Sequence, residues 1–409
     1  MAQQYFLDLI SEHENWRRSC MNLIASENAL SPAVRQALDN DFVQRYGNYL
    51  GRDLRQRRYS GSRYIQQIEI ELTAIIKEVF KAKEVELRAI SGHVAGLAVI
   101  MATCQPGDTV LEIAGHDGGH GLAIKAAESP LIDLNVLPLP FDPFSFNIDV
   151  QETCKLIAET KPRLVILGSS NFLFPHPVQQ ITSCLAQSPN TVLAYDASHV
   201  FGLIACGQFQ DPLEEGAQVI FGSTHKTLPG PQGGLIISND AALMEAISVS
   251  IYPGIVTNHH LMRSPALGVA LLEMKNHPEY AQQVIANAQA LGRRLHHHSL
   301  PVLASERMYT RSHTILLATA PFGTGKEIAR LLEAADIMCS YTKLPQALGT
   351  EGIRMGTSEV TRLGAQEHTL DDAADIIADV LHGRVQAAEA QSAVHAWADG
   401  LSEIHFAEI

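Results

Sequence analysis

Short apolar segments alternate with helix-length segments through the middle of the chain. Strands that are apolar along their whole length are expected where helices cover both faces of a sheet. Helix-length stretches such as 149–159 and 177–186 separate the apolar segments. The alternation therefore predicts a mostly parallel α/β sheet. The five apolar runs, each bounded by Gly, Pro or Asp, lie at 109–114, 163–168, 191–196, 218–223 and 233–238.

The pattern changes near Pro265. A long helical segment is expected from there through Leu291, and a mixed region follows, with the strand-like SHTILLAT and IRMGTSEV and with helices near 326–335 and 371–381. This mixture is typical of a smaller α+β domain. We therefore expect three parts, which are an N-terminal helical arm at 1–30, a large α/β domain at 31–265, and a long connecting helix with a small C-terminal domain at 266–409.

Composition narrows the class of protein. The 409 residues are 46% hydrophobic, and 30 Lys and Arg against 44 Asp and Glu give a net charge of −14, which disfavours binding to nucleic acid or to an anionic membrane. No stretch approaches the ~20 apolar residues that a membrane span needs. Six cysteines without a CxxC pair predict neither a metal site nor a disulfide framework, but reduced and mostly buried thiols. We expect a cytoplasmic enzyme.

Two of the expected strands end in residues suited to cofactor chemistry. Asp196 ends the run at 191–196, and Lys226 follows the run at 218–223, between Ser223 and Thr224 on one side and a Gly-Pro-Gln-Gly-Gly segment on the other. In open α/β sheets, ligands bind beyond the carboxyl ends of the strands. A lysine there is placed to form a Schiff base with an aldehyde cofactor, and an aspartate can keep a pyridine nitrogen protonated. Most lysines are merely solvated, but the pairing with Asp196 favours catalysis.

Three segments carry a resemblance to a known family. The segments STHKTLPGPQGG, YDASHVFGL and NLIASENALSP resemble the signatures of serine hydroxymethyltransferase, a pyridoxal-phosphate (PLP) family with the aspartate-aminotransferase-like fold, called fold type I. The resemblance runs collinearly from about Asn22 to Arg362. It implies a large PLP-binding domain built on a mostly parallel seven-stranded sheet and a small α+β domain.

The resemblance also implies roles for the residues around the cofactor. It makes Lys226 the lysine that binds PLP covalently, Asp196 the partner of the pyridine nitrogen, and His199 a neighbour of the phenolic oxygen. It places His120, in AGHDGGHGL, flat against the ring as a catalytic residue, and it counts His225 among the cofactor-binding residues. For His199 and His120 a purely structural role is the alternative.

A phosphate cradle is expected where AISGHVAGLAVI begins a helix. Ser91 and Gly92 precede this apolar helix, and Ser223 can add a donor. The family usually has a further hydroxyl residue where this chain has His93. His93 therefore either donates to the phosphate or caps the helix.

The substrate and a second subunit are implied by further segments. GIRMGT resembles the family's carboxylate-binding segment and nominates Arg354, because bidentate arginine suits a carboxylate. Ser26 is placed near that carboxylate. Tyr46 matches a tyrosine that reaches the partner's phosphate, and Thr257 and Asn258 stand where the family has a glycine-rich loop across the interface. A homodimer with shared active sites is therefore expected.

This chain departs from the family pattern on the side that binds folate. Asn48 stands where the family has a glutamate that serves proton transfer, and an amide cannot act as a general acid or base. Only Tyr59, which we assign to catalysis and substrate binding, remains of a tyrosine pair. The turn after His120 also differs. Five arginines form either an anion-binding mouth for a second substrate, or a solvated face or an intersubunit ion-pair network, and they are Arg52, Arg55, Arg57, Arg58 and Arg63.

These features predict aldol-type cleavage or formation of the Cα–Cβ bond of a small amino acid such as glycine, serine or a threonine-like substrate. We expect an aldolase or transaldolase that does not require folate and that uses an anionic or aldehyde co-substrate. The alternatives are a true folate-dependent hydroxymethyltransferase, or a racemase, aminotransferase or decarboxylase on the same scaffold. A non-catalytic PLP-binding relative is disfavoured, because it would not need Lys226, Asp196, His199 and Arg354 together.

Overall fold

The computed structural model describes residues 2–129 and 132–408, which form two compact units. The larger unit covers Leu30–Ala281 and the last residues from Phe406, and the smaller unit combines the segment up to Ala29 with Gln282–His405. The predicted division at residue 265 lies inside helix α10 (Arg263–Asn276), which belongs to the larger unit. The N-terminal segment is not a separate arm, because β1 (Met21–Asn22) pairs with β12 (Ile337–Met338) of the smaller unit.

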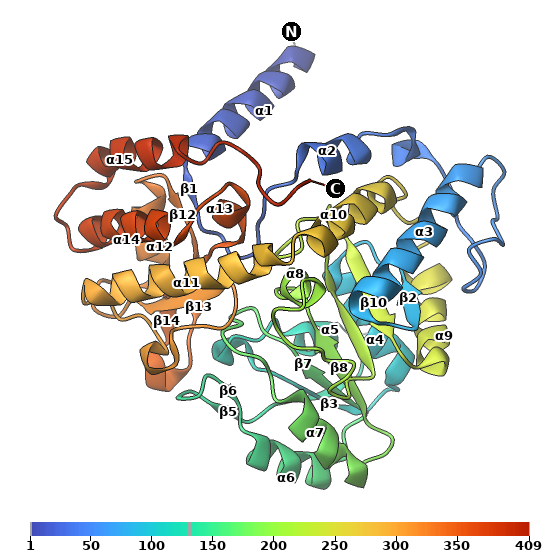
Figure 1. The fold of residues 1–409 in the computed structure, drawn as a ribbon. Coiled ribbons are helices and arrows are strands. Elements are labelled where there is room, and N and C mark those ends of the chain that lie inside the picture. The colour runs from blue at the N-terminus through green and yellow to red at the C-terminus, as the bar shows by residue number, and fades with distance from the viewer. Residues whose placement is uncertain (1, 130–131, 409) are drawn as a thin grey trace. The chain divides into compact units, whose positions relative to one another are not determined.

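The larger unit contains a seven-stranded sheet with the order β2-β10-β9-β8-β7-β3-β4 (Figure 1). Strand β10 runs antiparallel to both of its neighbours, and the strands from β9 to β4 are parallel to one another. The predicted mostly parallel seven-stranded sheet is confirmed. Its strands are β2 (Glu84–Glu86), β3 (Thr109–Glu112), β4 (Asn135–Pro138), β7 (Leu164–Leu167), β8 (Val192–Asp196), β9 (Val219–Ser223) and β10 (Gly234–Ser238). A small hairpin joins β5 (Phe141–Asp142) and β6 (Asn147–Ile148).

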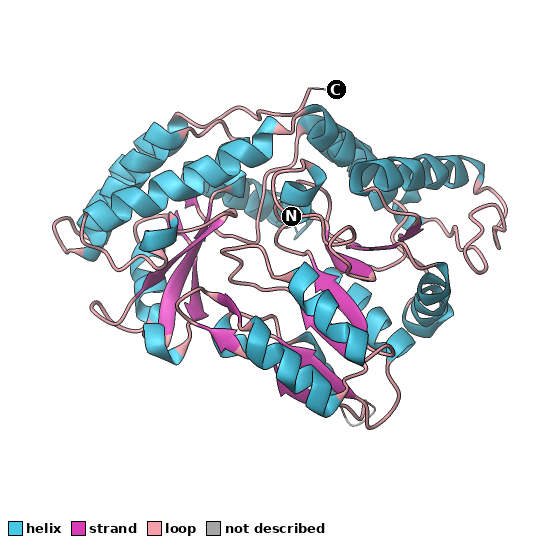
Figure 2. Ribbon diagram, turned by 60° about the horizontal axis from the view of Figure 1, so that its bottom comes forward, coloured by secondary structure: helices cyan, strands magenta, loops and turns pink. Residues whose placement is uncertain are grey.

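Helices border the strands of this sheet (Figure 2). Helix α4 (Gly92–Thr103) is apolar on nearly every side because it packs against β9, β10 and α9, and Ala95, Ala98 and Val99 are fully buried. Its first residue, Gly92, lies against Ser223 at the end of β9. The other helices of the larger unit are α2 (Pro32–Leu38), α3 (Arg63–Phe80), α5 (Leu122–Ala127), α6 (Val150–Thr160), α7 (Val178–Cys184), α8 (Phe201–Ala205) and α9 (Ala241–Val249).

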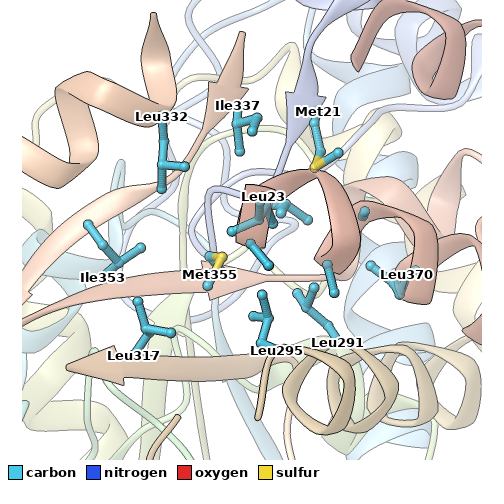
Figure 3. Close-up of a cluster of buried hydrophobic side chains, with 14 of the residues drawn as sticks. Met21, Leu23, Leu291, Leu295, Leu317, Leu332, Ile337, Ile353, Met355 and Leu370 are labelled. Carbon is cyan, nitrogen blue, oxygen red and sulfur yellow. The ribbon is translucent and has the colours of Figure 1, made fainter. Parts of the chain in front are cut away.

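The smaller unit has its own apolar core around an antiparallel sheet of order β11-β14-β13 (Figure 3). Met21 and Leu23 of the N-terminal segment are buried there with Leu291, Leu295 and Met355. Burial of one such side chain is worth about 1.5–3 kcal/mol, so the core fixes the chain just before Ser26. The elements are α1 (Ala2–Ser19), α11 (Glu279–His297), α12 (Gly325–Glu333), α13 (Ser358–Arg362), α14 (Glu367–Leu381), α15 (Ala387–Asp399), β11 (Thr314–Ala318), β13 (Ser340–Lys343) and β14 (Glu351–Gly356).

Three details differ from the sequence prediction. The long helix expected from residue 265 to 291 is two helices, α10 and α11, because Pro278 interrupts the pattern between them. Helix α15 and the strands β2 and β4 were not predicted. Cys154 and Cys184 form a disulfide between α6 and α7, with their Cα atoms 5.3 Å apart, so the prediction of reduced thiols is wrong for this pair.

Among the described residues, none of the helices is long and apolar enough to cross a membrane.

Candidate active site

Asp196 and Lys226 follow two neighbouring strands of the sheet. Strands β8 and β9 are parallel, with Asp196 paired to Phe221, so the segments after both strands leave the sheet at the same edge. Asp196 is the last residue of β8, and its Oδ1 accepts a hydrogen bond of 2.9 Å from the backbone N–H of Ser198. Gly168 packs against this aspartate, since a Cβ there would lie 2.6 Å from the Asp196 Cβ. The strand ends therefore set the position of both groups, as the sequence predicted.

His120 lies within the electrostatic reach of both groups. Desolvation by the surrounding protein is the main reason that the pKa of His120 falls to about 4, although part of its side chain remains exposed. The Asp196 carboxylate opposes this shift, and the ammonium groups of Lys125 and Lys226 add to it. Lys125 Nζ also donates to the His120 carbonyl over 2.6 Å. His120 is therefore neutral near pH 7.

His93 contacts His120. His93 Nδ1 lies 3.4 Å from His120 Nε2, and the two rings meet edge to face with centroids 5.7 Å apart. Desolvation and the charge of Lys125 lower the pKa of His93, while Asp196 opposes the shift. The cap of helix α4 is Ser91, whose Oγ accepts from the backbone N–H of Val94 over 3.1 Å. His93 does not cap the helix, so that sequence alternative is wrong.

The N-terminus of α4 lies close against the end of β9. A Cβ on Gly92 would lie 2.5 Å from Ser223 Oγ and 2.7 Å from the Ser223 backbone nitrogen. Ser198 Oγ accepts from that Ser223 N–H over 3.0 Å. Backbone N–H groups at a helix N-terminus with hydroxyls beside them suit a phosphate. The residues present therefore fit the phosphate end of PLP, while Asp196 and Lys226 fit its ring nitrogen and aldehyde.

Replacing Gly92 with alanine is expected to weaken PLP binding. The added methyl group would overpack the contact with Ser223, which costs about 1–3 kcal/mol and corresponds to a loss of about 5- to 150-fold in affinity. The dissociation constant can be measured by absorbance titration of the apo-protein. Gly268→Ala in α10 is the control, because its Cβ would have an ordinary 3.9 Å contact with Leu72. Equal PLP affinities of the two variants would contradict the assignment of the phosphate site to the N-terminus of α4.

Two further histidines lie on the segments after these strands. His199 is buried, and its carbonyl accepts from Thr227 Oγ1 over 2.8 Å. Thr227 Oγ1 also accepts from the Gly202 N–H over 3.0 Å. Thr227 directly follows Lys226, so these bonds tie the segment of the lysine to the segment after Asp196. Sequence reasoning missed Thr227, although it adjoins the lysine. Burial and the neighbouring Lys226 lower the pKa of His225 to about 4.

Tyr46 and Tyr59 lie together on the surface. Their ring centroids are 5.2 Å apart, and both side chains are exposed, by 54% and 41%. Thr257 is exposed as well, and Asn258 is half-buried. These residues, which the resemblance assigns to a shared site, therefore leave polar groups open to solvent in this single chain.

The basic segment is not an open anion-binding mouth along its whole length. Arg57 is buried and forms an ion pair of 2.7 Å with the buried Glu69, and Arg52 pairs with Glu84. Arg58 Nη1 donates to the Tyr252 hydroxyl over 3.3 Å. Arg52 and Arg57 are therefore ion-paired, but within one chain and not between subunits as the sequence alternative had it. Arg55 and Arg63 are exposed.

In the smaller unit, Ser26 and Arg354 lie on adjoining segments. Gly356 of β14 donates to the Leu23 carbonyl over 2.8 Å, and its Cα leaves no room for a side chain because a Cβ would lie 2.4 Å from the Ala25 Cα. Arg354, two residues earlier, has its Nε 3.3 Å from Ser340 Oγ. Burial lowers the pKa of Arg354 to about 10, which still leaves it charged near pH 7.

A carboxylate beside this segment carries an unusual pKa. Glu27 pairs with Arg17 over 2.6 Å, and Glu359 lies 4.0 Å from the same guanidinium. Burial raises the pKa of Glu359 from 4.5 to about 7, although Arg17 opposes the shift. The folded state binds the Glu359 proton more tightly than the unfolded state does. The stabilisation that this proton gives to the fold is therefore fully present below pH 4.5 and is lost as the pH rises through 7.

Glu359→Gln should therefore stabilise the fold at pH 8 by about 3 kcal/mol, since one pKa unit corresponds to 1.36 kcal/mol. At pH 5 the substitution should change the free energy of unfolding little. Urea denaturation at the two pH values measures both numbers. A stabilisation that is equal at pH 5 and pH 8 would show that ionisation of Glu359 is not its cause.

The sheet order, the lysine and aspartate at the strand ends and the small α+β unit define a PLP-dependent enzyme of fold type I. The family model described as serine hydroxymethyltransferase matches residues 1–377. The chain belongs to this serine hydroxymethyltransferase family. It is a PLP-dependent transferase or aldolase. Among the described residues, no group of three or more His, Cys, Asp and Glu side chains could hold a metal ion.

Named relatives and a solved structure support this assignment. The chain is 41% identical over 391 residues to a serine hydroxymethyltransferase of Methanopyrus kandleri, covering 94% of this chain and 90% of that relative. It is 40% identical over 394 residues to one of Korarchaeum cryptofilum, covering 92% and 90%. The crystal structure of an L-threonine transaldolase from Pseudomonas fluorescens, in its internal aldimine state, matches with a TM-score of 0.91 and 28% identity, covering 98% of this chain and 91% of that one.

Proposed function

We propose that this enzyme makes or breaks the Cα–Cβ bond of a small amino acid in an aldol-type reaction that does not require folate. The observation that carries the reaction class is the placement of Asp196 and Lys226 after neighbouring parallel strands, with the charges of both acting on His120. Glycine, serine and threonine-like amino acids are the proposed substrates, with an aldehyde as the second substrate.

Each residue has a defined task in this proposal. Lys226 binds the aldehyde of PLP, and Asp196 keeps the pyridine nitrogen protonated. PLP supplies the electron sink that stabilises negative charge at Cα. A neutral His120 can stack on the pyridine ring. It adds no positive charge that would compete with the protonated pyridine nitrogen for the Asp196 carboxylate. His199 is the proposed neighbour of the phenolic oxygen.

The substrate carboxylate is assigned to Arg354. A charged guanidinium in a buried setting binds a carboxylate more strongly than an exposed one does, because water screens the interaction less. Ser26, on the segment next to β14, is the proposed second donor. Tyr59 is the proposed group at the substrate hydroxyl.

The absence of a folate requirement rests on Asn48. Its amide nitrogen donates to the Thr257 carbonyl, and an amide does not exchange protons near neutral pH. A proton at the substrate hydroxyl must therefore be moved by another group. The alternative is a true folate-dependent hydroxymethyltransferase, which the names of the relatives from Methanopyrus kandleri and Korarchaeum cryptofilum favour.

The two candidates separate in one assay with the wild-type enzyme. We expect acetaldehyde to be released from L-threonine, and a new β-hydroxy amino acid to form from glycine and an added aldehyde, at the same rates with and without tetrahydrofolate. Formation of glycine from serine only in the presence of tetrahydrofolate, without threonine cleavage, would establish the alternative.

We also propose that the enzyme acts as a homodimer with shared active sites. Tyr46, Thr257 and Asn258 are assigned to the cofactor phosphate of the partner subunit, and Tyr46 and Thr257 are exposed in the single chain. A site assembled from two chains needs at least a dimer. Sedimentation equilibrium of the holoenzyme measures the mass, and an active monomer would refute the shared site.

A further inference from the structure

Asn48 is a buried amide with a defined orientation. Its residue is 3% exposed, and its Nδ2 donates to the Thr257 carbonyl, which lies 209 positions later in the chain. The amide nitrogen must face this carbonyl, because two oxygen acceptors would repel each other. The Oδ1 atom is buried without a hydrogen-bond partner among the described residues. The role of Asn48 in this chain is therefore that of a donor.

Three separate segments are joined around this amide. The Asn48 carbonyl accepts from the Arg58 N–H over 2.8 Å, and Tyr49 and Arg57 form an antiparallel bridge. The side chain of Asn48 adds the third segment, at Thr257. The residues 46–50, 57–59 and 257–259 therefore meet at one point.

Glu69 reinforces the same junction from helix α3. One of its carboxylate oxygens lies 2.7 Å from Arg57 Nη1, and the other accepts from His259 Nε2 over 2.7 Å. All three side chains are 5% exposed or less. The contacts of Glu69 thus hold Arg57 and His259 on the buried side of the junction. The contact that holds Thr257 itself comes from Asn48.

The segments that meet at Asn48 carry the groups proposed above for the partner subunit's cofactor. Tyr46 precedes Asn48 by two residues, and the amide holds Thr257, which Asn258 follows. Displacement of the 257–258 segment would therefore move these donors away from a phosphate. This step rests on the proposed function, and in particular on the shared site.

We propose that Asn48 is a positioning residue whose amide N–H holds the Thr257–Asn258 segment in place for the cofactor phosphate of a second copy of the chain. A carboxylate of the same shape has only acceptors and cannot form this contact. The amide therefore replaces an ionisable group by a donor that works at every pH. Asn48 acts through the segment and does not itself exchange protons.

The test is the affinity of the apo-protein for PLP, measured by absorbance titration at pH 8. Asn48→Asp is nearly isosteric and is expected to weaken PLP binding at least tenfold. Asn48→Gln, which retains the N–H donor, should recover most of the affinity. The spectrum at saturating PLP should be the same for all variants, because Lys226 is untouched. In turnover assays at subsaturating PLP, the loss should be reversed by adding more cofactor, which a defect in the chemical step would not allow.

The charged and titratable residues on the segments that meet at this junction, and on α3 beside them, are Tyr46, Tyr49, Arg57, Arg58, Tyr59, Glu69, His259 and His260. The two arginines favour its ionised form, so it is an acceptor at pH 8. Asn147→Asp is the matched control, since Asn147 Nδ2 also donates to a carbonyl, that of Pro175, over 2.8 Å. Its PLP affinity should stay within twofold of wild type.

PLP affinity of Asn48→Asp within twofold of wild type would overturn the proposal. If this variant does not fold, Asn48→Leu, which has a similar volume and no donor, is compared with Asn48→Gln. Weak binding by the leucine variant and recovery by the glutamine variant support the proposal, and equal binding by the two overturns it. The measurement contains no folate, so its failure is distinct from a failure of the proposed reaction.

Discussion

Replacement of Lys226 with alanine is expected to lower turnover by at least about 10³-fold, because the only ε-amine assigned to the cofactor aldehyde is removed. The variant should still bind PLP, since the phosphate cradle at Gly92 and the carboxylate of Asp196 are unchanged. Its bound cofactor should lack the absorbance of a lysine adduct. Steady-state rates on threonine, with the absorbance spectrum of the same sample, measure both effects.

Lys155→Ala controls for a general loss of positive charge. Lys155 lies on α6, is 55% exposed and pairs with Glu152 in the same helix, over 2.7 Å. Its removal should leave the rate and the spectrum unchanged. If Lys226→Ala kept a rate within tenfold of wild type, the assignment of the cofactor lysine would be wrong.

The second large effect is expected on stability, at Glu69. Burial alone would raise the pKa of Glu69, but the hydrogen bond from His259 and the charge of Arg57 lower it, so the carboxylate is ionised and paired. Glu69→Ala would leave the Arg57 guanidinium buried without its counter-charge. Breaking a buried ion pair in this way costs about 3–5 kcal/mol. Urea denaturation of the apo-protein measures the loss.

An exposed pair provides the comparison. Asp41 and Arg45 are joined by a bidentate contact of 2.7 Å, but both side chains are more than half exposed. Exposed helical pairs of this kind contribute a few tenths of a kcal/mol, so Asp41→Ala should change stability little. A destabilisation by Glu69→Ala no larger than that of Asp41→Ala would show that burial does not strengthen the Glu69 contacts.

Much of the fold could be predicted because its signal is local. The apolar runs that became β3, β7, β8, β9 and β10 consist mostly of buried side chains. The strands β2 and β4 gave no such signal, since β2 reads Glu-Val-Glu and β4 begins with Asn135 and ends with Pro138. Helix α15 was missed because polar and small residues make up most of its sequence.

The candidate site also has residues with a local sequence signal and residues without one. The positions of Asp196, at the end of β8, and of Lys226, three residues after β9, could be predicted because both strands are recognisable apolar runs. The pairing of Glu69 with His259 spans 190 residues, and no local pattern reports such a contact. For the same reason the sequence could not show that Arg57 is buried and paired while Arg55 beside it in the segment is exposed. Long-range burial, rather than residue type, decides which arginine is structural.

The most direct test of the account is to locate the lysine that carries PLP. The holoenzyme is reduced with borohydride, digested, and the phosphopyridoxyl peptide is sequenced by mass spectrometry. One modified peptide is expected, with the label on Lys226 within STHKTLPGPQGG. A label on another lysine, or no label from a sample saturated with PLP, would contradict it.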